Sequence, residues 1–276
     1  MFTRNILLYP SANGQRKQGV GKFPNIIKSY IKPFYNVHET TLNNDIYNDT
    51  NTMYKLCNKF NKLICIGGDH STSIATGSSS LNKYEDIKFI WIDAHPDINT
   101  YASSITKNFH GMPLSFLTGL DKFTKPYINN ELPHQNLNYI PIVDKQLPFN
   151  NLCYIGIRDI DNYEKKIIND NNIYTITSTE VNTNIFTVIK NLSIFIGDSP
   201  VHLSFDVDSI NPEFISSTGT PVPGGLNLVS CKKLLDSIYK HNIVTMDIVE
   251  MNLDINKPNY NNSLNNFKSL FPQLFS

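Results

Sequence analysis

Two carboxylates and an imidazole stand at alternate positions in the run Asp93-Ala94-His95-Pro96-Asp97, directly after the apolar residues 87–92. Alternate side chains of an extended segment point to the same face, so Asp93, His95 and Asp97 are predicted to converge beyond a strand. Unpaired charges are costly to bury, whereas ligands of these types hold a divalent metal ion well. Taken alone the motif is also compatible with an acidic surface loop, because short patterns arise by chance.

Two further segments end in a similar way. The apolar run 201–207 carries Asp206 and leads to Asp208, and the apolar run 63–66 leads to His70 in the sequence GGDHS. The three segments together supply four carboxylates and two imidazoles, which is more than one ion needs. They predict a two-metal site with bridging carboxylates and a bound water.

These segments resemble the ureohydrolase family, and within it the arginases. The resemblance rests on GGDHS, DAHPDIN, HGMPLSFL, IRDID, SFDVDSINP, GTPVPGGL and VEMN, which follow the family's order from about residue 63 to residue 252. It implies two manganese ions per chain, bridged by Asp93 and Asp206. The remaining ligands would be His70 and Asp97 for one ion, and His95 and Asp208 for the other. An oxygen-rich set with some imidazole suits Mn²⁺, and Fe, Co and Ni remain open.

The resemblance also implies hydrolysis of L-arginine to L-ornithine and urea. The guanidinium carbon is a poor electrophile, and a metal lowers the pKa of water from about 15.7 to about 7, so a metal-bridging hydroxide would be the nucleophile. Asp97 would accept a hydrogen bond from this hydroxide, and His110 matches the family's proton-shuttling histidine. Glu250 matches the carboxylate that faces the guanidinium group.

Other positions correspond by resemblance to residues that bind the amino-acid end of the substrate. They are Asp161 and Glu164 for the α-amino group, Asn99, Thr106 and Asn108 for the α-carboxylate, and Thr220 in GTPVPGGL. Taken singly, the Asn and Thr residues are also ordinary loop formers. The length of the segment 93–110 is similar to that of arginases and favours arginine over agmatine.

Four positions depart from the family's usual sequence. Lys107, Ser209, Asn211 and Leu253 stand where Gly, Gly, Asp and Pro are usual. A cation at position 107 is compatible with help in carboxylate binding, or with filling space where backbone should approach the ligand. None of the four removes an expected metal ligand, so they bear on substrate fit.

Three alternatives to arginine hydrolysis stay open. The first is a ureohydrolase that acts on agmatine, guanidinobutyrate or formiminoglutamate. The second is an enzyme of the related deacetylase branch with a single zinc, against which the extra ligands His70 and Asp97 speak. The third is a catalytically silent, metal-keeping protein that binds arginine; His110 and Glu250 speak against it, whereas Lys107 and Leu253 leave it open.

Composition limits the partners and the compartment. The formal net charge is +0, from 24 basic and 24 acidic side chains, which favours neither nucleic acid nor a membrane surface as a partner. The four cysteines lack C-x-x-C spacing, which argues against a disulfide framework and favours a reduced, cytoplasmic setting. Neither a signal peptide nor an apolar run long enough to span a bilayer is evident. A homo-oligomer is possible, but the charged residues associated with arginase trimers are not seen at residues 227–230.

The chain is predicted to form one arginase-like domain, residues 1–276, with a three-layer α-β-α fold around a mainly parallel sheet. Unbroken apolar runs, typical of buried parallel strands, occur at 6–9, 63–66, 87–92, 152–157, 173–176, 201–207 and 243–249. Helical patterns occupy 24–32, 45–60, 184–192 and 228–239. Residues 123–149 are predicted to be a long irregular connection, and 256–276 a loop followed by a short closing helix in 267–275. In such sheets ligands bind beyond the carboxyl ends of the strands, where every motif above is placed.

Overall fold

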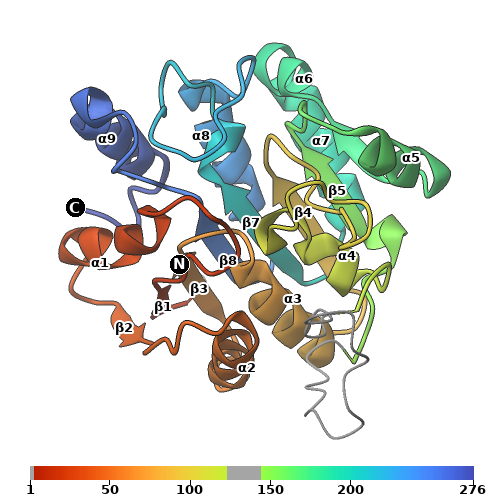
Figure 1. The fold of residues 1–276 in the computed structure, drawn as a ribbon. Helices are drawn as coiled ribbons and strands as arrows, with labels where there is room; N and C mark the ends of the chain where they lie inside the picture. The colour runs from red at the N-terminus through yellow and green to blue at the C-terminus, as the bar shows by residue number, and fades with distance from the viewer. Residues whose placement is uncertain (1–2, 123–143) are drawn as a thin grey trace, which may run out of the picture.

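A single eight-stranded sheet organises the computed structural model, which describes residues 3–122 and 144–276 (Figure 1). The strand order is β2-β1-β3-β8-β7-β4-β5-β6, and each pair of neighbours is parallel. The strands are β1 (Asn5–Tyr9), β2 (Asn36–Glu39), β3 (Leu63–Gly67), β4 (Lys88–Ile92), β5 (Leu152–Ile155), β6 (Tyr174–Ile176), β7 (Val201–Asp206) and β8 (Ile243–Val249). The predicted α/β fold with a parallel sheet is confirmed.

Helices cover both faces of the sheet (Figure 1). They are α1 (Phe23–Ile27), α2 (Ile46–Cys57), α3 (Thr72–Lys83), α4 (Pro113–Leu117), α5 (Asn162–Asp170), α6 (Ser178–Thr183), α7 (Ile185–Ile196), α8 (Leu228–Ile238) and α9 (Tyr260–Leu270). Side-chain acceptors begin several of them: Asp45 caps α2, Asp161 caps α5 and Asn227 caps α8. Such caps satisfy amide groups that the first turn leaves without partners.

Alternate strand residues pack into different layers. Ile6 and Leu8 of β1 contribute to the core shared with α1, α6, α7, α8 and α9, whereas Leu7 and Tyr9 pack with α2 and α3 on the other face. The inner strands β3, β5, β7 and β8 are buried on both faces, which explains why their sequences read as unbroken apolar runs. This arrangement is the three-layer α-β-α order that those runs predicted.

Several predicted boundaries were wrong. The run 152–157 leaves the sheet after Ile155, and the pattern 24–32 is an α-helix only from Phe23 to Ile27. β2 was missed because it is an edge strand without an apolar run, and its four residues are exposed or half-buried. The closing helix α9 begins at Tyr260, inside the Asn-rich stretch, because burial of Leu264, Phe267 and Leu270 outweighs the low helix propensity of Asn.

Other predictions concern segments and residue types. The expected irregular connection 123–149 lies mostly outside the described residues. Of this segment, the structure describes residues 144–149. All four cysteines are free and buried. Within residues 3–122 and 144–276, no helix is long and apolar enough to cross a membrane.

Candidate metal centre and substrate site

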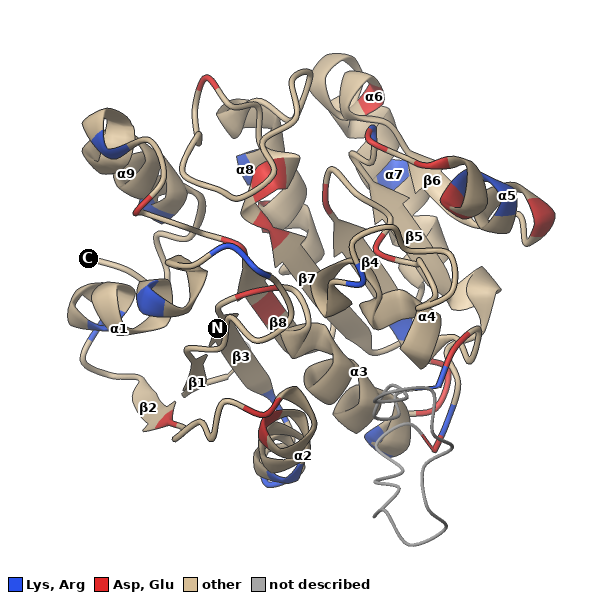
Figure 2. Ribbon diagram, viewed as in Figure 1, with Lys and Arg blue, Asp and Glu red and all other residues tan. Residues whose placement is uncertain are grey.

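The candidate site lies where the four central strands end. β3, β8, β7 and β4 are consecutive neighbours in the sheet, and each is followed at its carboxyl end by one of the motifs. Acidic residues gather at these strands in the middle of the molecule, while charges of both signs are interspersed on outer helices such as α5 (Figure 2). Side chains from sequence segments far apart are therefore brought together at one edge.

The first ligand group surrounds His70. Its Nδ1 atom lies 3.1 Å from Asp93 Oδ2, 2.9 Å from Asp97 Oδ2 and 3.2 Å from Asp206 Oδ2. The imidazole is buried, yet Nδ1 has no hydrogen-bond partner with acceptable geometry. A buried nitrogen facing three carboxylate oxygens is what a shared cation would satisfy.

The second ligand group surrounds His95. Its Nδ1 atom lies 3.2 Å from Asp208 Oδ2 and 3.5 Å from Asp93 Oδ1. Asp93 therefore belongs to both groups, one oxygen to each, which is the geometry of a bridging carboxylate. Asp206 contacts the first group through Oδ2, while its Oδ1 accepts a 2.8 Å hydrogen bond from the backbone N–H of Asp208.

The ligands converge for a reason other than the predicted strand alternation. β4 ends at Ile92, and Asp97 has a φ of 51°, in the left-handed region that is costly for residues other than glycine. Asp208 lies in a 3-10 turn, Val207–Ser209, that follows β7. Turns rather than an extended segment aim these carboxylates, and strained backbone of this kind often accompanies functional sites.

Neighbouring side chains hold the ligands in place. The Trp91 ring stacks on His70 with centroids 4.2 Å apart, and its Nε1–H donates to Asp93 Oδ2 at 3.0 Å. Thr220 donates its hydroxyl to Asp208 Oδ2 at 2.9 Å, so its contact is with an expected metal ligand. Arg158 donates to the backbone carbonyls of Asp208 and Val222, which joins the two loops.

The carboxylates gathered at this edge of the sheet repel one another, and a positive charge between them would lower the repulsion. Burial and the Asp93 carboxylate raise the pKa of Asp97 to about 6. Burial, with the Asp208 and Asp93 carboxylates, raises the pKa of Asp206 well above its usual range. The donor set of carboxylate oxygens and imidazole nitrogens fits two divalent cations such as Mn²⁺, which would relieve this repulsion.

A second cluster lies around Glu250, which follows β8. Its Oε1 atom is 3.0 Å from His110 Nδ1 and accepts a 2.9 Å hydrogen bond from the backbone N–H of His70. Gln15 donates its amide group toward both carboxylate oxygens, at 3.0 and 2.8 Å. Glu250 is buried with a φ of 67°, again in the left-handed region. The structure thus joins the expected proton-shuttling and guanidinium-facing residues directly.

The residues expected at the amino-acid end of the substrate form a third cluster. Asn99 donates to Asp161 Oδ2 at 2.7 Å, and Asp161 Oδ1 accepts a 2.9 Å hydrogen bond from the backbone N–H of Glu164. Glu164 is buried and accepts from the backbone N–H of Asp161 at 3.2 Å and of Ile98 at 3.4 Å. Asp161 is exposed, so its carboxylate remains within reach of a ligand.

The loop that carries Thr106, Lys107 and Asn108 closes on itself. Lys107 has a φ of 59°, a conformation that glycine adopts more easily. Its ammonium group donates to the backbone carbonyls of Tyr101 and Ala102, so it fastens the loop instead of extending freely. Thr106 is exposed, and its hydroxyl accepts from the backbone N–H of Asn108 at 3.3 Å.

The comparisons with known proteins agree with this geometry. A family model described as "Arginase family" matches residues 23–265. The chain belongs to the arginase family. The arginase of Saccharomyces cerevisiae is 37% identical over 201 residues, which cover 70% of this chain and 57% of that protein. The arginase of Plasmodium falciparum is 38% identical over 206 residues, which cover 73% of this chain and 48% of that protein.

A solved structure of the arginase family matches almost the whole chain. It is Entamoeba histolytica arginase in complex with L-ornithine, with a TM-score of 0.82 and 29% identity. The match covers 98% of this chain and 99% of that chain. By contrast, the chain spans only about half to three fifths of the length of the curated arginases named above.

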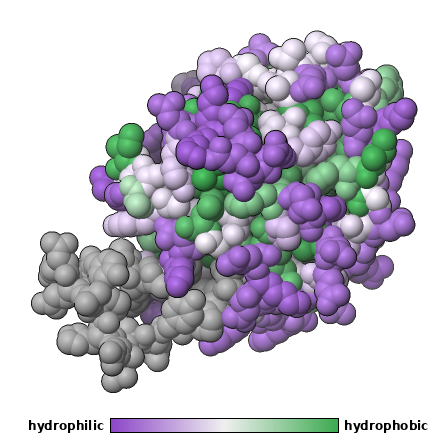
Figure 3. Space-filling model, turned by 90° about the vertical axis from the view of Figure 1, so that its right-hand side faces the viewer, coloured by the Kyte–Doolittle hydropathy of each residue, from purple (hydrophilic) through white to green (hydrophobic). Residues whose placement is uncertain are grey.

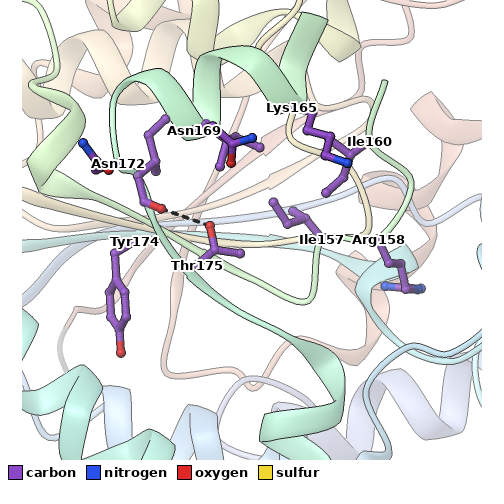
Figure 4. A pocket seen from close by; sticks show the side chains of 10 residues that line it. Ile157, Arg158, Ile160, Lys165, Asn169, Asn172, Tyr174 and Thr175 are labelled. Carbon is purple, nitrogen blue, oxygen red and sulfur yellow. Dashed lines mark hydrogen bonds between the residues drawn. The ribbon is translucent and has the colours of Figure 1, made fainter. Parts of the chain in front are cut away.

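A groove of about 790 Å³ lies between α5 and β6, and Arg158, which donates to the Asp208 carbonyl, is among its lining residues. Figure 4 shows its lining side chains, among them Lys165, Asn169 and Tyr174. The face of the molecule in Figure 3 shows hydrophobic residues exposed between hydrophilic ones. None of the His70 and His95 ligands lines this groove, so the candidate chemistry belongs to the strand ends of the sheet.

Two functional candidates were missed in the sequence. Gln15 is one of several polar residues in the loop 11–18, far upstream of the first motif, and nothing in the sequence distinguishes it from its neighbours. Asp247 interrupts the apolar run of β8 and is completely buried. A lone carboxylate in a strand buried on both faces needs donors around it, which was a usable signal.

Proposed function

We propose that this chain hydrolyses L-arginine to L-ornithine and urea with two Mn²⁺ ions. The observation that carries the proposal is that Asp93 belongs to two adjacent ligand groups. His70, Asp97 and Asp206 would complete one site, and His95 and Asp208 the other, with Asp206 as the second bridge. When bound, two such ions supply a strong oxygen nucleophile at neutral pH by lowering the pKa of water.

The residues of the chain then orient the substrate and move protons. Glu250 would pair with the planar guanidinium group, a directional contact between a cation and a carboxylate. Gln15 contacts both oxygens of Glu250 and fixes their plane. Asp97 would accept a hydrogen bond from the attacking oxygen, because its carboxylate belongs to the first ligand group.

His110 is the group proposed to protonate the leaving amine. Its Nδ1 atom faces Glu250, so Nε2 is the ring nitrogen available for proton transfer to the substrate. Burial lowers the pKa of His110, but the Glu250 carboxylate outweighs burial, and the pKa is raised to about 9. In the chain without metal ions the imidazole therefore carries a proton over the neutral range, as a general acid requires.

Arginine is favoured over other guanidino compounds by the cluster around Asp161. Asp161 would bind the α-amino group, with Glu164 as its support, and Asn99, Thr106 and Asn108 would bind the α-carboxylate. The L-ornithine in the Entamoeba histolytica structure supports this choice, since ornithine is the product that retains both groups. Thr220 would support the site through Asp208 instead of binding the substrate itself.

Urea release from a panel of substrates tests the proposal. Purified chain loaded with Mn²⁺ is incubated with L-arginine, agmatine or guanidinobutyrate, and a mock purification from cells that lack the chain serves as the control for contaminating activity. We expect urea from arginine well above the other two. Urea mainly from agmatine or guanidinobutyrate would assign another ureohydrolase substrate, and no urea from a fully loaded chain would favour the silent arginine-binding protein.

A further inference from the structure

A line of buried hydroxyl groups connects His70 with Asp247. His70 Nε2 lies 2.8 Å from Ser204 Oγ, and Ser204 Oγ lies 3.3 Å from Ser73 Oγ. Ser73 Oγ donates to Asp247 Oδ2 at 2.8 Å. All four residues are 1% exposed or less, so water does not substitute for any link.

The line crosses three elements behind the proposed metal centre. Ser204 belongs to β7, Ser73 to α3 and Asp247 to β8, and α3 packs on these two strands. Asp247 Oδ2 also accepts from Thr76 Oγ1 at 2.6 Å and lies 3.1 Å from His202 Nε2. Several groups therefore converge on one carboxylate oxygen, which acts as the common acceptor of the network.

The order of the donors follows from the two ends of the line. A metal ion at His70 Nδ1 takes the lone pair of that nitrogen, so the ring proton resides on Nε2 and is donated to Ser204. Ser204 then donates its own proton to Ser73, and Ser73 donates to Asp247. In the reverse order Ser73 would donate to Ser204, and Asp247 would lose that donor. Because Asp247 keeps its donor Ser73 only in the first order, its carboxylate favours that order, in which His70 Nδ1 carries no proton.

We propose that Asp247 is a positioning residue of the metal centre, which acts on His70 through Ser73 and Ser204. By accepting the last hydrogen bond it fixes the tautomer and the ring orientation of His70. Partners of this kind beyond the ligands raise the basicity of a ligand imidazole and strengthen metal binding. The inference rests on the proposed metal centre and adds residues outside all of its expected ligands.

The second histidine provides an internal comparison. Within the described part of the chain, the acidic partner of His95 Nε2 is Asp159, at 3.6 Å, and the Asp159 side chain is 69% exposed. A contact of that length between partly solvated groups orients an imidazole weakly. The network therefore serves one half of the centre, and its removal should weaken one of two ions.

Metal titrations of Ser73→Ala test the proposal without using activity. Mn²⁺ is titrated calorimetrically into the metal-free chain. Asp208→Ala, which lacks an expected ligand of the His95 half, identifies the binding event at His70. Ser73→Ala should weaken the His70 event about 10- to 100-fold and leave the His95 event unchanged. Asp247→Asn is the second variant and should weaken the same event.

Ser78→Ala is the matched control. Ser78 lies in the same helix, is 1% exposed, and donates to the backbone carbonyl of Ile74 at 2.5 Å, away from the line to His70. It should leave both binding events as in the unmodified chain, with a melting temperature of the metal-free protein close to that of Ser73→Ala.

Three results would overturn the inference. The first is an Mn²⁺ affinity at the His70 event that Ser73→Ala leaves within about twofold of the unmodified chain, well below the loss typical of such partners. The second is an equal loss of affinity at both events. The third is an unmodified chain that binds no Mn²⁺. A chain that binds two ions but releases no urea would refute the proposed function alone, because the titration does not depend on turnover.

Discussion

The two histidines of the proposed centre stand in different surroundings. The His70 side chain is 1% exposed and its Nδ1 atom faces three carboxylates, whereas the His95 side chain is 21% exposed and its Nδ1 atom faces two. Trp91 stacks on His70, and a hydroxyl line holds its far nitrogen. His95 has the exposed Asp159 in the corresponding place. One half is therefore closed and held by several contacts, and the other is open to solvent.

This difference separates two tasks within one centre. A closed half with its partners fixed before binding holds an ion tightly, since little ordering is needed when the ion arrives. An open half lets an ion and a substrate exchange with solvent. We therefore expect the ion beside His95 to leave first when a chelator is added, and activity to follow its loss.

The largest effect is expected from Asp93, the carboxylate that both halves share. Asp93→Ala should remove both ions and lower urea release by about three orders of magnitude or more, because the proposed nucleophile is a water activated by these ions. Asp208→Ala is the matched variant and should retain the His70 ion. Metal content per chain distinguishes the two, and equal retention of metal by both variants would show that Asp93 is not shared.

His110→Asn should lower turnover by at least about a hundredfold, the usual contribution of a positioned general acid. Metal content should remain at the level of the unmodified chain, because His110 contacts Glu250 and none of the ligands directly. Turnover number and metal content are measured on the same preparation. Unchanged turnover would remove His110 from the mechanism.

Asp161→Ala should raise the KM for arginine about 10- to 100-fold, since a charge-assisted hydrogen bond contributes about 1.5–3 kcal/mol. Guanidinobutyrate lacks an α-amino group, so any weak turnover of it should change little. The comparison of the two substrates is the measurement. Equal losses on both would mean that Asp161 acts through the loop and not on the amino group.

Gln15→Ala should raise the KM for arginine by a few-fold, up to about tenfold, because Glu250 loses an amide donor that holds its carboxylate plane. Gln18→Ala is the control, as Gln18 is exposed and lies in the same loop. Steady-state kinetics on both variants is sufficient. A large fall in kcat with unchanged KM would contradict a role in substrate positioning.

The smallest effect concerns pH and the metal-free chain. The Glu250 carboxylate outweighs burial and raises the pKa of His110 from 6.5 to about 9. The protonated form therefore stabilises the folded state, fully below about pH 6.5, and this stability is lost as pH rises through 9. The free energy of unfolding is measured in EDTA at pH 6 and at pH 9.5, for the unmodified chain and for His110→Asn. The stability advantage of the unmodified chain over the variant should be smaller at pH 9.5 than at pH 6, by on the order of 1 kcal/mol. A constant difference would contradict the shift.

The sequence predicted the ligands better than it predicted how they converge. Asp93 and His70 carry chemistry in their residue types and follow apolar runs, so their place at strand ends could be inferred. The left-handed backbone of Asp97 could not, because no local pattern encodes a conformation that tertiary contacts impose on a non-glycine residue. The prediction of alternating side chains named residues that the structure does bring together, although turns and not an extended segment bring them there.

Long-range contacts account for most of what was missed. Gln15 and Glu250 are 235 residues apart, and only the sheet order brings the N-terminal loop over the end of β8. β2 carries no apolar run because it lies at an edge, and α9 depends on packing of a few apolar side chains among asparagines. Patterns that depend on burial were visible in the sequence, and positions defined by distant partners were not.

The most direct test of this account is a stepwise titration of the metal-free chain with Mn²⁺, with urea release from arginine measured at every step. We predict two binding events of unequal affinity, the tighter one eliminated by Asp97→Ala and the weaker one by Asp208→Ala, with activity rising as the second ion binds. A single binding event that already gives full activity would contradict a centre of two unequal halves.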